Sequence, residues 1–125
     1  MNRSDAWIGG LLAAGFMAVL LPFARLVVDL HHDGIMLKPA LDVLSGQTLF
    51  RDTFMQYGAL SCYLQALALW LHPTLLALKL QAVAAYGVSL FFLYGAWRQI
   101  LPRSLAILSC GLLVLFFPKG ETAHA

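Results

Sequence analysis

The sequence predicts an all-α membrane protein with about four transmembrane helices and a short interfacial helix in the first loop. Its mean hydropathy is +0.79 and only 11% of its residues are charged, whereas roughly a quarter are charged in an ordinary soluble domain. Long uncharged stretches recur along the chain, and about 20 apolar residues cross the hydrocarbon core as a helix. The ionisable residues gather instead between residues 29 and 58, which hold four of the six acidic residues.

The first span is expected at about residues 7–28, because residues 6–24 carry no charge. A secretory signal is the alternative for this segment. Its apolar part, however, is longer than the roughly 7 to 15 residues of a signal core, and no A-x-A-like cleavage site follows it. We therefore expect an uncleaved anchor.

Three further spans are expected at about residues 57–71, 75–97 and 103–118. His72 and Pro73 separate the first two of these, because proline disfavours helical geometry in the residue before it. The last span reaches full length only if Arg103 and Lys119 extend to the two membrane surfaces. Cys62 and Cys110 fall inside spans, where a thiol is most often a small packing residue.

The loop at about residues 29–56 mixes polar and apolar residues and is expected to lie on the membrane surface. A short interfacial helix is predicted there, with one apolar face: Met36, Pro39, Ala40, Val43 and Leu44. Lys38 and Asp42 lie on its other face as an i, i+4 ion pair. Pro39 fits only the first turn, and Gly46 predicts the C-terminal end. Phe50, Phe54 and Tyr57 suit the headgroup zone.

Asp33 is the main catalytic candidate, with His32 beside it. A carboxylate at the rim of the bilayer, followed by Gly34, could act as a general base if it is partly desolvated. The alternative is that these residues only form the polar start of the loop and have no catalytic role. A metal site at His31, His32 and Asp33 is not predicted, because three adjacent residues on a helix point in different directions.

Lys38, Arg51 and Asp52 are the candidate substrate-binding residues of the same loop. Arg51 could hold a phosphate with its planar fork of donors, or it could simply pair with Asp52 and fix the loop. Arg25, in the last turn of the first span, is expected to extend to the same membrane surface. Nucleic-acid binding is not expected, because the net charge is only +2 and no basic run occurs.

The order of these features resembles the N-terminal part of polytopic membrane glycosyltransferases of the GT-C fold, the class that includes dolichyl-phosphate-mannose and aminoarabinose transferase-like enzymes. The matching features follow the first span: an acid just outside it, Ala40, Leu44 and Gly46 in an A-x-x-x-L-x-G pattern, LFRD at residues 49–52, and Tyr57-Gly58. A second span then ends in LHPTLLALKL, and a third ends in an aromatic-Gly-x-x-Arg pattern. The resemblance covers roughly residues 10–117.

This resemblance implies transfer of a sugar from a polyprenyl-phosphate carrier to an acceptor outside the cytoplasm, at a bacterial inner membrane. Asp33 matches the family's first-loop acid, although the family often has two acids where this chain has His32 and Asp33. No organic cofactor is implied, and a need for a divalent metal is left open. Family members have many more spans, so we expect this chain to be an N-terminal part of a larger enzyme.

Two further expectations are open to test. The chain could instead be a small four-helix membrane subunit or scaffold without catalytic activity, which binds a partner through its surface helix.

For the orientation in the membrane, the resemblance places the first loop outside. Four alternating spans then put Lys38, Arg51, Arg98 and Arg103 outside and Arg3, Lys79 and Lys119 inside. The positive-inside rule weakly favours the opposite orientation, because more of these basic residues would then lie inside.

Overall fold

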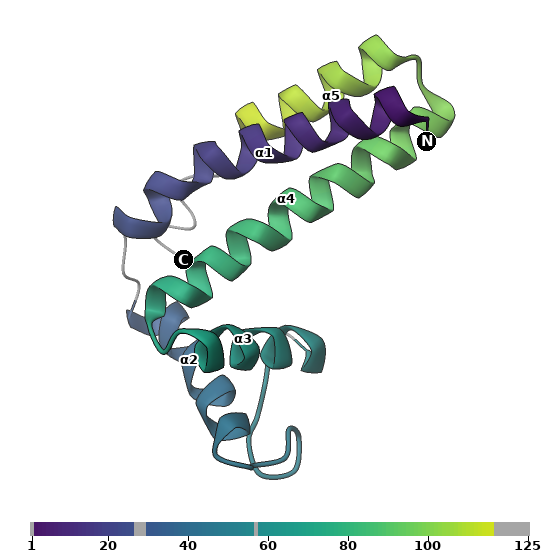
Figure 1. Ribbon diagram of the computed structural model, residues 1–125. Helices are drawn as coiled ribbons and strands as arrows, with labels where there is room; N and C mark the ends of the chain where they lie inside the picture. Colours follow the sequence, from purple (N-terminus) through teal and green to yellow (C-terminus); the bar gives the residue numbers. More distant parts are fainter. Residues whose placement is uncertain (1, 27–29, 57, 117–125) are drawn as a thin grey trace.

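The computed structural model describes residues 2–26, 30–56 and 58–116, and the side chains of residues 2–25, 33–56 and 58–116. The described part contains five helices: α1 (Arg3–Leu26), α2 (Leu30–Leu44), α3 (Ala59–Leu71), α4 (Leu75–Ile100) and α5 (Arg103–Phe116) (Figure 1). No strand occurs among these residues, apart from an isolated bridge between Leu49 and Thr53. The predicted all-α class is confirmed.

α1 and α4 are the longest helices and pack against each other in antiparallel directions (Figure 1). Small residues allow the close approach: a Cβ atom on Gly9 would lie 3.0 Å from Tyr94 Cδ1, and one on Gly87 would lie 2.6 Å from Met17 Sδ. α5 lies along the same pair. The core shared by these three helices contains Phe16, Leu20, Val83, Leu90, Tyr94, Ala106 and Cys110.

α2 and α3 form a second unit beside the end of α1 and α4 that lies away from the N-terminus (Figure 1). Ala40 is fully buried there and packs with Ala66, Leu69 and Leu78, which come from α3 and α4. Gly46 has φ of +90°, and the N–H of Gln47 donates to the Asp42 carbonyl at 2.9 Å. This left-handed glycine ends α2, as predicted.

The break between α3 and α4 also follows the sequence prediction. α3 ends at Leu71, just before His72 and Pro73, and α4 begins at Leu75. Thr74 caps α4, because its hydroxyl accepts a hydrogen bond from the Ala77 N–H at 3.3 Å. The two cysteines, Cys62 and Cys110, are unpaired and fully buried, which agrees with the packing role expected for them.

The start of α2 differs from the prediction. The helix begins at Leu30, so Pro39 lies in its interior rather than in its first turn. Proline there removes one backbone hydrogen bond. Pro39 is nevertheless buried. Of the predicted apolar face, Ala40 is fully buried and Val43 partly buried, whereas Leu44 is exposed.

The expected positions of three basic residues are corrected by the structure. Four alternating spans would separate Arg98 and Arg103 from the N-terminus, and would separate Lys79 from Asp33. Instead, Arg98 and Arg103 lie 3.2 Å and 3.1 Å from Asp5 in the first turn of α1. Lys79 lies 3.3 Å from Asp33. The reason is that α4 begins beside the C-terminal half of α1 and returns toward the N-terminus (Figure 1).

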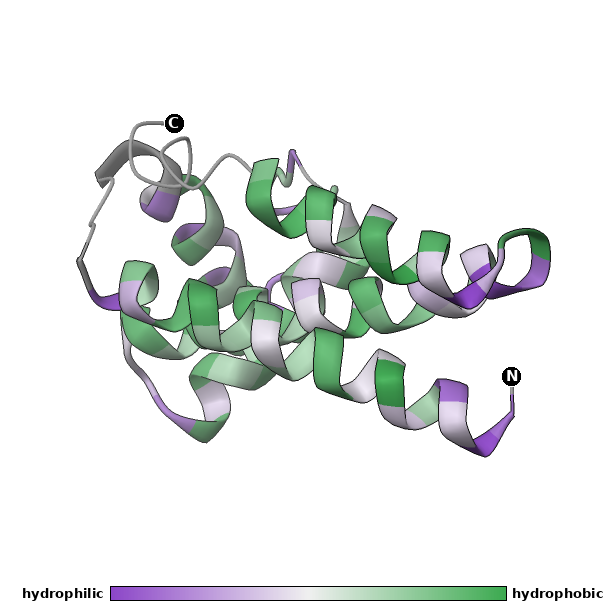
Figure 2. Cartoon of the chain, turned by 90° about the horizontal axis from the view of Figure 1, so that it is seen from above, coloured by the Kyte–Doolittle hydropathy of each residue, from purple (hydrophilic) through white to green (hydrophobic). Residues whose placement is uncertain are grey.

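Two of the described helical segments, Arg3–Arg25 and Leu75–Ile100, are long and apolar enough to cross a membrane. α3 and α5 are apolar but shorter, with 13 and 14 residues. Hydrophobic residues predominate along most helices, while hydrophilic residues gather near the N-terminus and in α2 and the connections (Figure 2). Many large apolar side chains on the outer faces are exposed, including Trp7, Leu11, Phe92 and Phe116.

Candidate functional site

A pocket of about 160 Å³ lies where α1, α2 and α4 meet. Its walls are mostly apolar and come from the C-terminal half of α1, the first half of α2 and the first half of α4. The lining residues are Leu20, Phe23, Ala24, Asp33, Met36, Leu78, Lys79, Ala82, Val83 and Tyr86. This position follows from the fold, because α2 leaves the helix pair where α4 begins.

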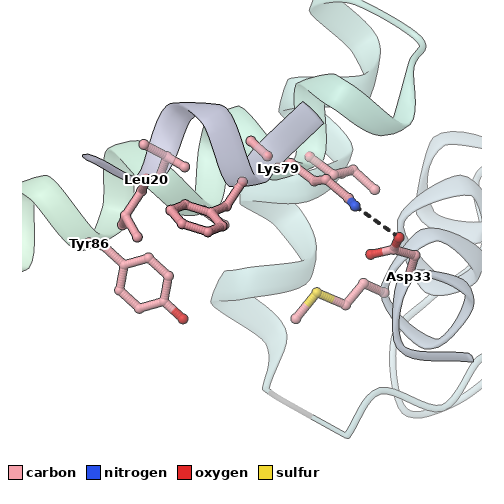
Figure 3. Close-up of a pocket in the computed structure, with 10 residues that line it drawn as sticks. Leu20, Asp33, Lys79 and Tyr86 are labelled. Carbon is pink, nitrogen blue, oxygen red and sulfur yellow. Dashed lines mark ion pairs between the residues drawn. The ribbon is translucent and has the colours of Figure 1, made fainter. Parts of the chain in front are cut away.

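The polar groups at one side of the pocket are Asp33 and Lys79. Asp33 lies in the first turn of α2, and Lys79 lies in the second turn of α4. Lys79 Nζ is 3.3 Å from Asp33 Oδ2, and the two side chains are 18% and 22% exposed, respectively. They point toward each other across the space between the two helices (Figure 3). Both charges are therefore shielded from most of the solvent but still reachable from the pocket.

Tyr86 and Leu20 lie at the other side of the pocket (Figure 3). The ring of Tyr86 packs against Phe16, with ring centroids 6.4 Å apart and the planes tilted by 55°. This contact holds the tyrosine on the wall formed by α1 and α4. A ligand in this pocket would meet a carboxylate and an ammonium group at one side, and mostly apolar side chains with the Tyr86 phenol elsewhere, a pattern that suits an amphipathic molecule.

The arrangement permits two kinds of chemistry. The Asp33 carboxylate can accept a hydrogen bond, or a proton, from a ligand hydroxyl group. The Lys79 ammonium can neutralise an anionic group on the same ligand. Metal binding has no support in the described side chains, because they include no group of three or more potential ligands.

The predicted substrate-binding residues lie elsewhere in the α2–α3 unit and do not line this pocket. Lys38 pairs with Asp42, as predicted, and Thr53 Oγ1 donates to the same Asp42 carboxylate at 2.6 Å. The hydrogen bond from Lys38, followed by the one from Thr53, lowers the pKa of Asp42 below its usual value. Lys38 thus pairs within α2, and Thr53 joins the loop to the helix.

Arg51 and Asp52 form an exposed pair in the loop, with Arg51 Nε 3.5 Å from Asp52 Oδ1. Asp52 also accepts a hydrogen bond from the Thr48 N–H at 2.9 Å. Arg51 and Asp52 therefore form the local pair that fixes the loop, which is one of the two roles that the sequence left open for Arg51. The structure does not bring Arg51 or Asp52 to Asp33.

Several predicted residues fall outside the described part. The backbone of His32 belongs to α2, but its side chain, like that of His31, lies outside the described residues. Tyr57, expected in the headgroup zone, lies outside them as well. Of the two predicted catalytic residues, the structure therefore places only Asp33 in the pocket.

Two groups of charged residues were not anticipated. Lys79 joins Asp33, although a lysine one turn inside an apolar span could have been recognised as a functional candidate. Asp5, Arg98 and Arg103 also come together at the other end of the molecule. Their sequence separation is so large that no local pattern relates them.

Comparison with protein-family models, with curated proteins and with solved structures finds no match to this chain.

Proposed function

We propose that the chain is a multi-pass protein of a bacterial cell membrane and carries the first-loop site of a glycosyltransferase. In this proposal the enzyme transfers a sugar from a polyprenyl-phosphate carrier to an acceptor outside the cytoplasm. The membrane part is supported by two helices of spanning length and by the exposed apolar outer faces. The enzymatic part is supported by the order of motifs that resembles GT-C glycosyltransferases.

The observation that carries the proposal is the position of Asp33 in the pocket. Its carboxylate is partly desolvated, 3.3 Å from Lys79, and faces apolar walls. We assign Asp33 the role of accepting a hydrogen bond or proton from the acceptor hydroxyl group. We assign Lys79 the neutralisation of the carrier phosphate. The apolar walls would contact the first part of the polyprenyl chain.

The test is transfer of a fluorescent or radiolabelled sugar by a full-length enzyme that carries this segment. General-base catalysis typically contributes about 10²- to 10⁴-fold, so Asp33→Asn should remove most turnover while leaving expression and carrier binding largely intact. Asp42→Asn is a matched control, because it also removes a carboxylate of α2 that pairs with a lysine. Asp42 pairs with Lys38, and Asp33 pairs with Lys79. It should cost much less.

Two outcomes would count against this assignment. If Asp33→Asn retained near-normal transfer while Asp52→Asn abolished it, the wrong carboxylate would have been chosen. If neither variant affected transfer, the glycosyltransferase proposal for this loop would fail.

The second candidate is a small membrane subunit or scaffold without catalytic activity. It is favoured by the outer face of α3, which leaves large apolar side chains uncovered: Leu60, Tyr63, Leu64, Leu67, Trp70 and Leu71. Such a face suits packing against other helices in a membrane. Absence of sugar transfer, together with co-purification of a stoichiometric membrane partner, would favour this candidate.

A further inference from the structure

The loop between α2 and α3 contains a tightly hydrogen-bonded tip at residues 48–54. The N–H of Asp52 donates to the Thr48 carbonyl at 2.9 Å, and the N–H of Phe50 donates to the Thr53 carbonyl at 2.8 Å. Thr53 Oγ1 also donates to Asp42, which ties the tip to α2. The tip is thus a defined structure rather than a free connection.

The tip presents its two largest apolar side chains outward. Leu49 and Thr53 are buried, whereas Phe50 and Phe54 are 62% and 79% exposed. Phe50 also has φ of +64°, in the left-handed region that bulky side chains rarely adopt. A backbone strained in this way persists only when surrounding contacts impose it, and such strain is concentrated at functional positions.

Exposed positive charge accompanies these aromatic rings. The side chain of Arg51, between the two phenylalanines, is 81% exposed. Together with Thr53, the residues Phe50, Arg51, Asp52 and Phe54 line a shallow hollow on the tip. Aromatic rings beside a cationic side chain are typical of the headgroup zone of a membrane, where the rings enter the boundary region and the cation contacts phosphate.

The surroundings of the tip favour a lipid surface over a protein partner. The apolar outer face of α3 begins at Leu60, shortly after the tip, and extends to Leu71. The charged pairs Lys38–Asp42 and Arg51–Asp52 lie in α2 and in the tip itself. Along the chain, the tip therefore lies between a helix with an exposed charged pair and a helix with an exposed apolar face, an order that suits the boundary of a bilayer.

We propose that the tip at residues 48–54 inserts Phe50 and Phe54 into the headgroup zone, with Arg51 contacting anionic lipid phosphates. This inference rests on the membrane insertion proposed above but not on sugar transfer. It assigns Arg51 to lipid rather than to a sugar carrier in the Asp33 pocket.

The experiment uses the protein reconstituted in vesicles of phosphatidylcholine with a minority of phosphatidylglycerol, after flotation has confirmed insertion. A nitroxide label is attached at Phe54→Cys or, as the matched control, at the exposed loop position Gln47→Cys. Cys62 and Cys110 are fully buried, so the parent chain measures background labelling. The label at residue 54 should collide several-fold more with oxygen than with a water-soluble nickel chelate, and residue 47 should show the reverse.

The effect of Arg51→Gln tests the lipid phosphate contact. This variant should reduce the oxygen preference of the label at residue 54 in mixed vesicles and leave it unchanged in phosphatidylcholine alone. Equal nickel access at residues 54 and 47 in a floated protein would overturn the insertion while leaving the proposed function untouched. Protection of residue 54 from both reagents would also overturn it, because protein would then cover the tip. Failure to float would overturn the inference and the proposed membrane location together.

Discussion

At Gly87, the absence of a side chain determines how closely α1 and α4 approach. A Cβ atom there would lie 2.6 Å from both Cγ and Sδ of Met17, whereas one on Gly10 would meet nothing within 4 Å. Gly10 faces outward on α1. The two glycines therefore differ in packing although both lie inside long helices.

Gly87→Ala should destabilise the protein by about 1–3 kcal/mol, because overpacking must displace Met17 or separate the two helices. Gly10→Ala is the control and should be neutral or stabilising by up to about 1 kcal/mol, since alanine favours the helix. Unfolding in mixed micelles of mild detergent and dodecyl sulfate measures both. Equal stabilities would show that Met17 moves aside without cost.

Among the helices, one acidic residue joins three of them at the N-terminal end. Asp5 of α1 is almost fully buried and accepts hydrogen bonds from Arg98 of α4 at 3.2 Å and from Arg103 of α5 at 3.1 Å. Arg98 also donates to the Leu101 carbonyl at 2.7 Å, which fixes the turn between α4 and α5. The carboxylate thus holds the two arginines against α1.

Asp5→Asn should lower the free energy of unfolding more than Asp52→Asn does. Asp52 pairs with Arg51 in an exposed setting, where such pairs contribute about 0–1 kcal/mol. Because Asp5 acts through its arginines, its substitution should cost less in an Arg98→Gln background than in the parent chain. The same mixed-micelle unfolding measures this cycle. Strict additivity of Asp5→Asn and Arg98→Gln would contradict a direct coupling.

The parts of the fold that could be predicted depend on local signals. His72 with Pro73 marked the break before α4, Gly46 marked the end of α2, and the spacing of Lys38 and Asp42 gave their ion pair. The start of α2 was missed because Pro39 was expected to fit only a first turn, whereas the helix holds it, buried, in its interior.

Local signals predict even less of the candidate site, because the site depends on contacts between residues far apart in the sequence. Asp33 could be selected by its place after the first span, but its contact with Lys79 joins residues 46 positions apart. That contact requires α4 to start beside α1, which hydropathy cannot specify. Asp5 and Arg98 were missed for the same reason, because their pairing depends on the direction in which two distant helices pack.

For the molecule as a whole, the antiparallel order of α1 and α4 changes the expected membrane topology. Four alternating spans would place residue 99 on the same side as the first loop. In the structure, the C-terminal end of α4 instead lies with the N-terminus, because Arg98 contacts Asp5. Within a membrane, this arrangement makes α1 and α4 successive crossings, with α2 and α3 at one surface between them. α3 agrees with this reading, because its 13 residues extend only about 20 Å.

Cysteines introduced one at a time at Asn2, Gln47 and Gln99, all exposed positions, distinguish the two topologies. The structure predicts that Asn2→Cys and Gln99→Cys react from one side of the membrane and Gln47→Cys from the other. A membrane-impermeant maleimide applied to intact and to permeabilised cells measures this, and the parent chain with its buried Cys62 and Cys110 supplies the background. Reaction of Gln99→Cys from the same side as Gln47→Cys would restore four alternating crossings. In that case the contact between Asp5 and Arg98 could not exist in the membrane, since the two residues would lie on opposite surfaces about 30 Å apart.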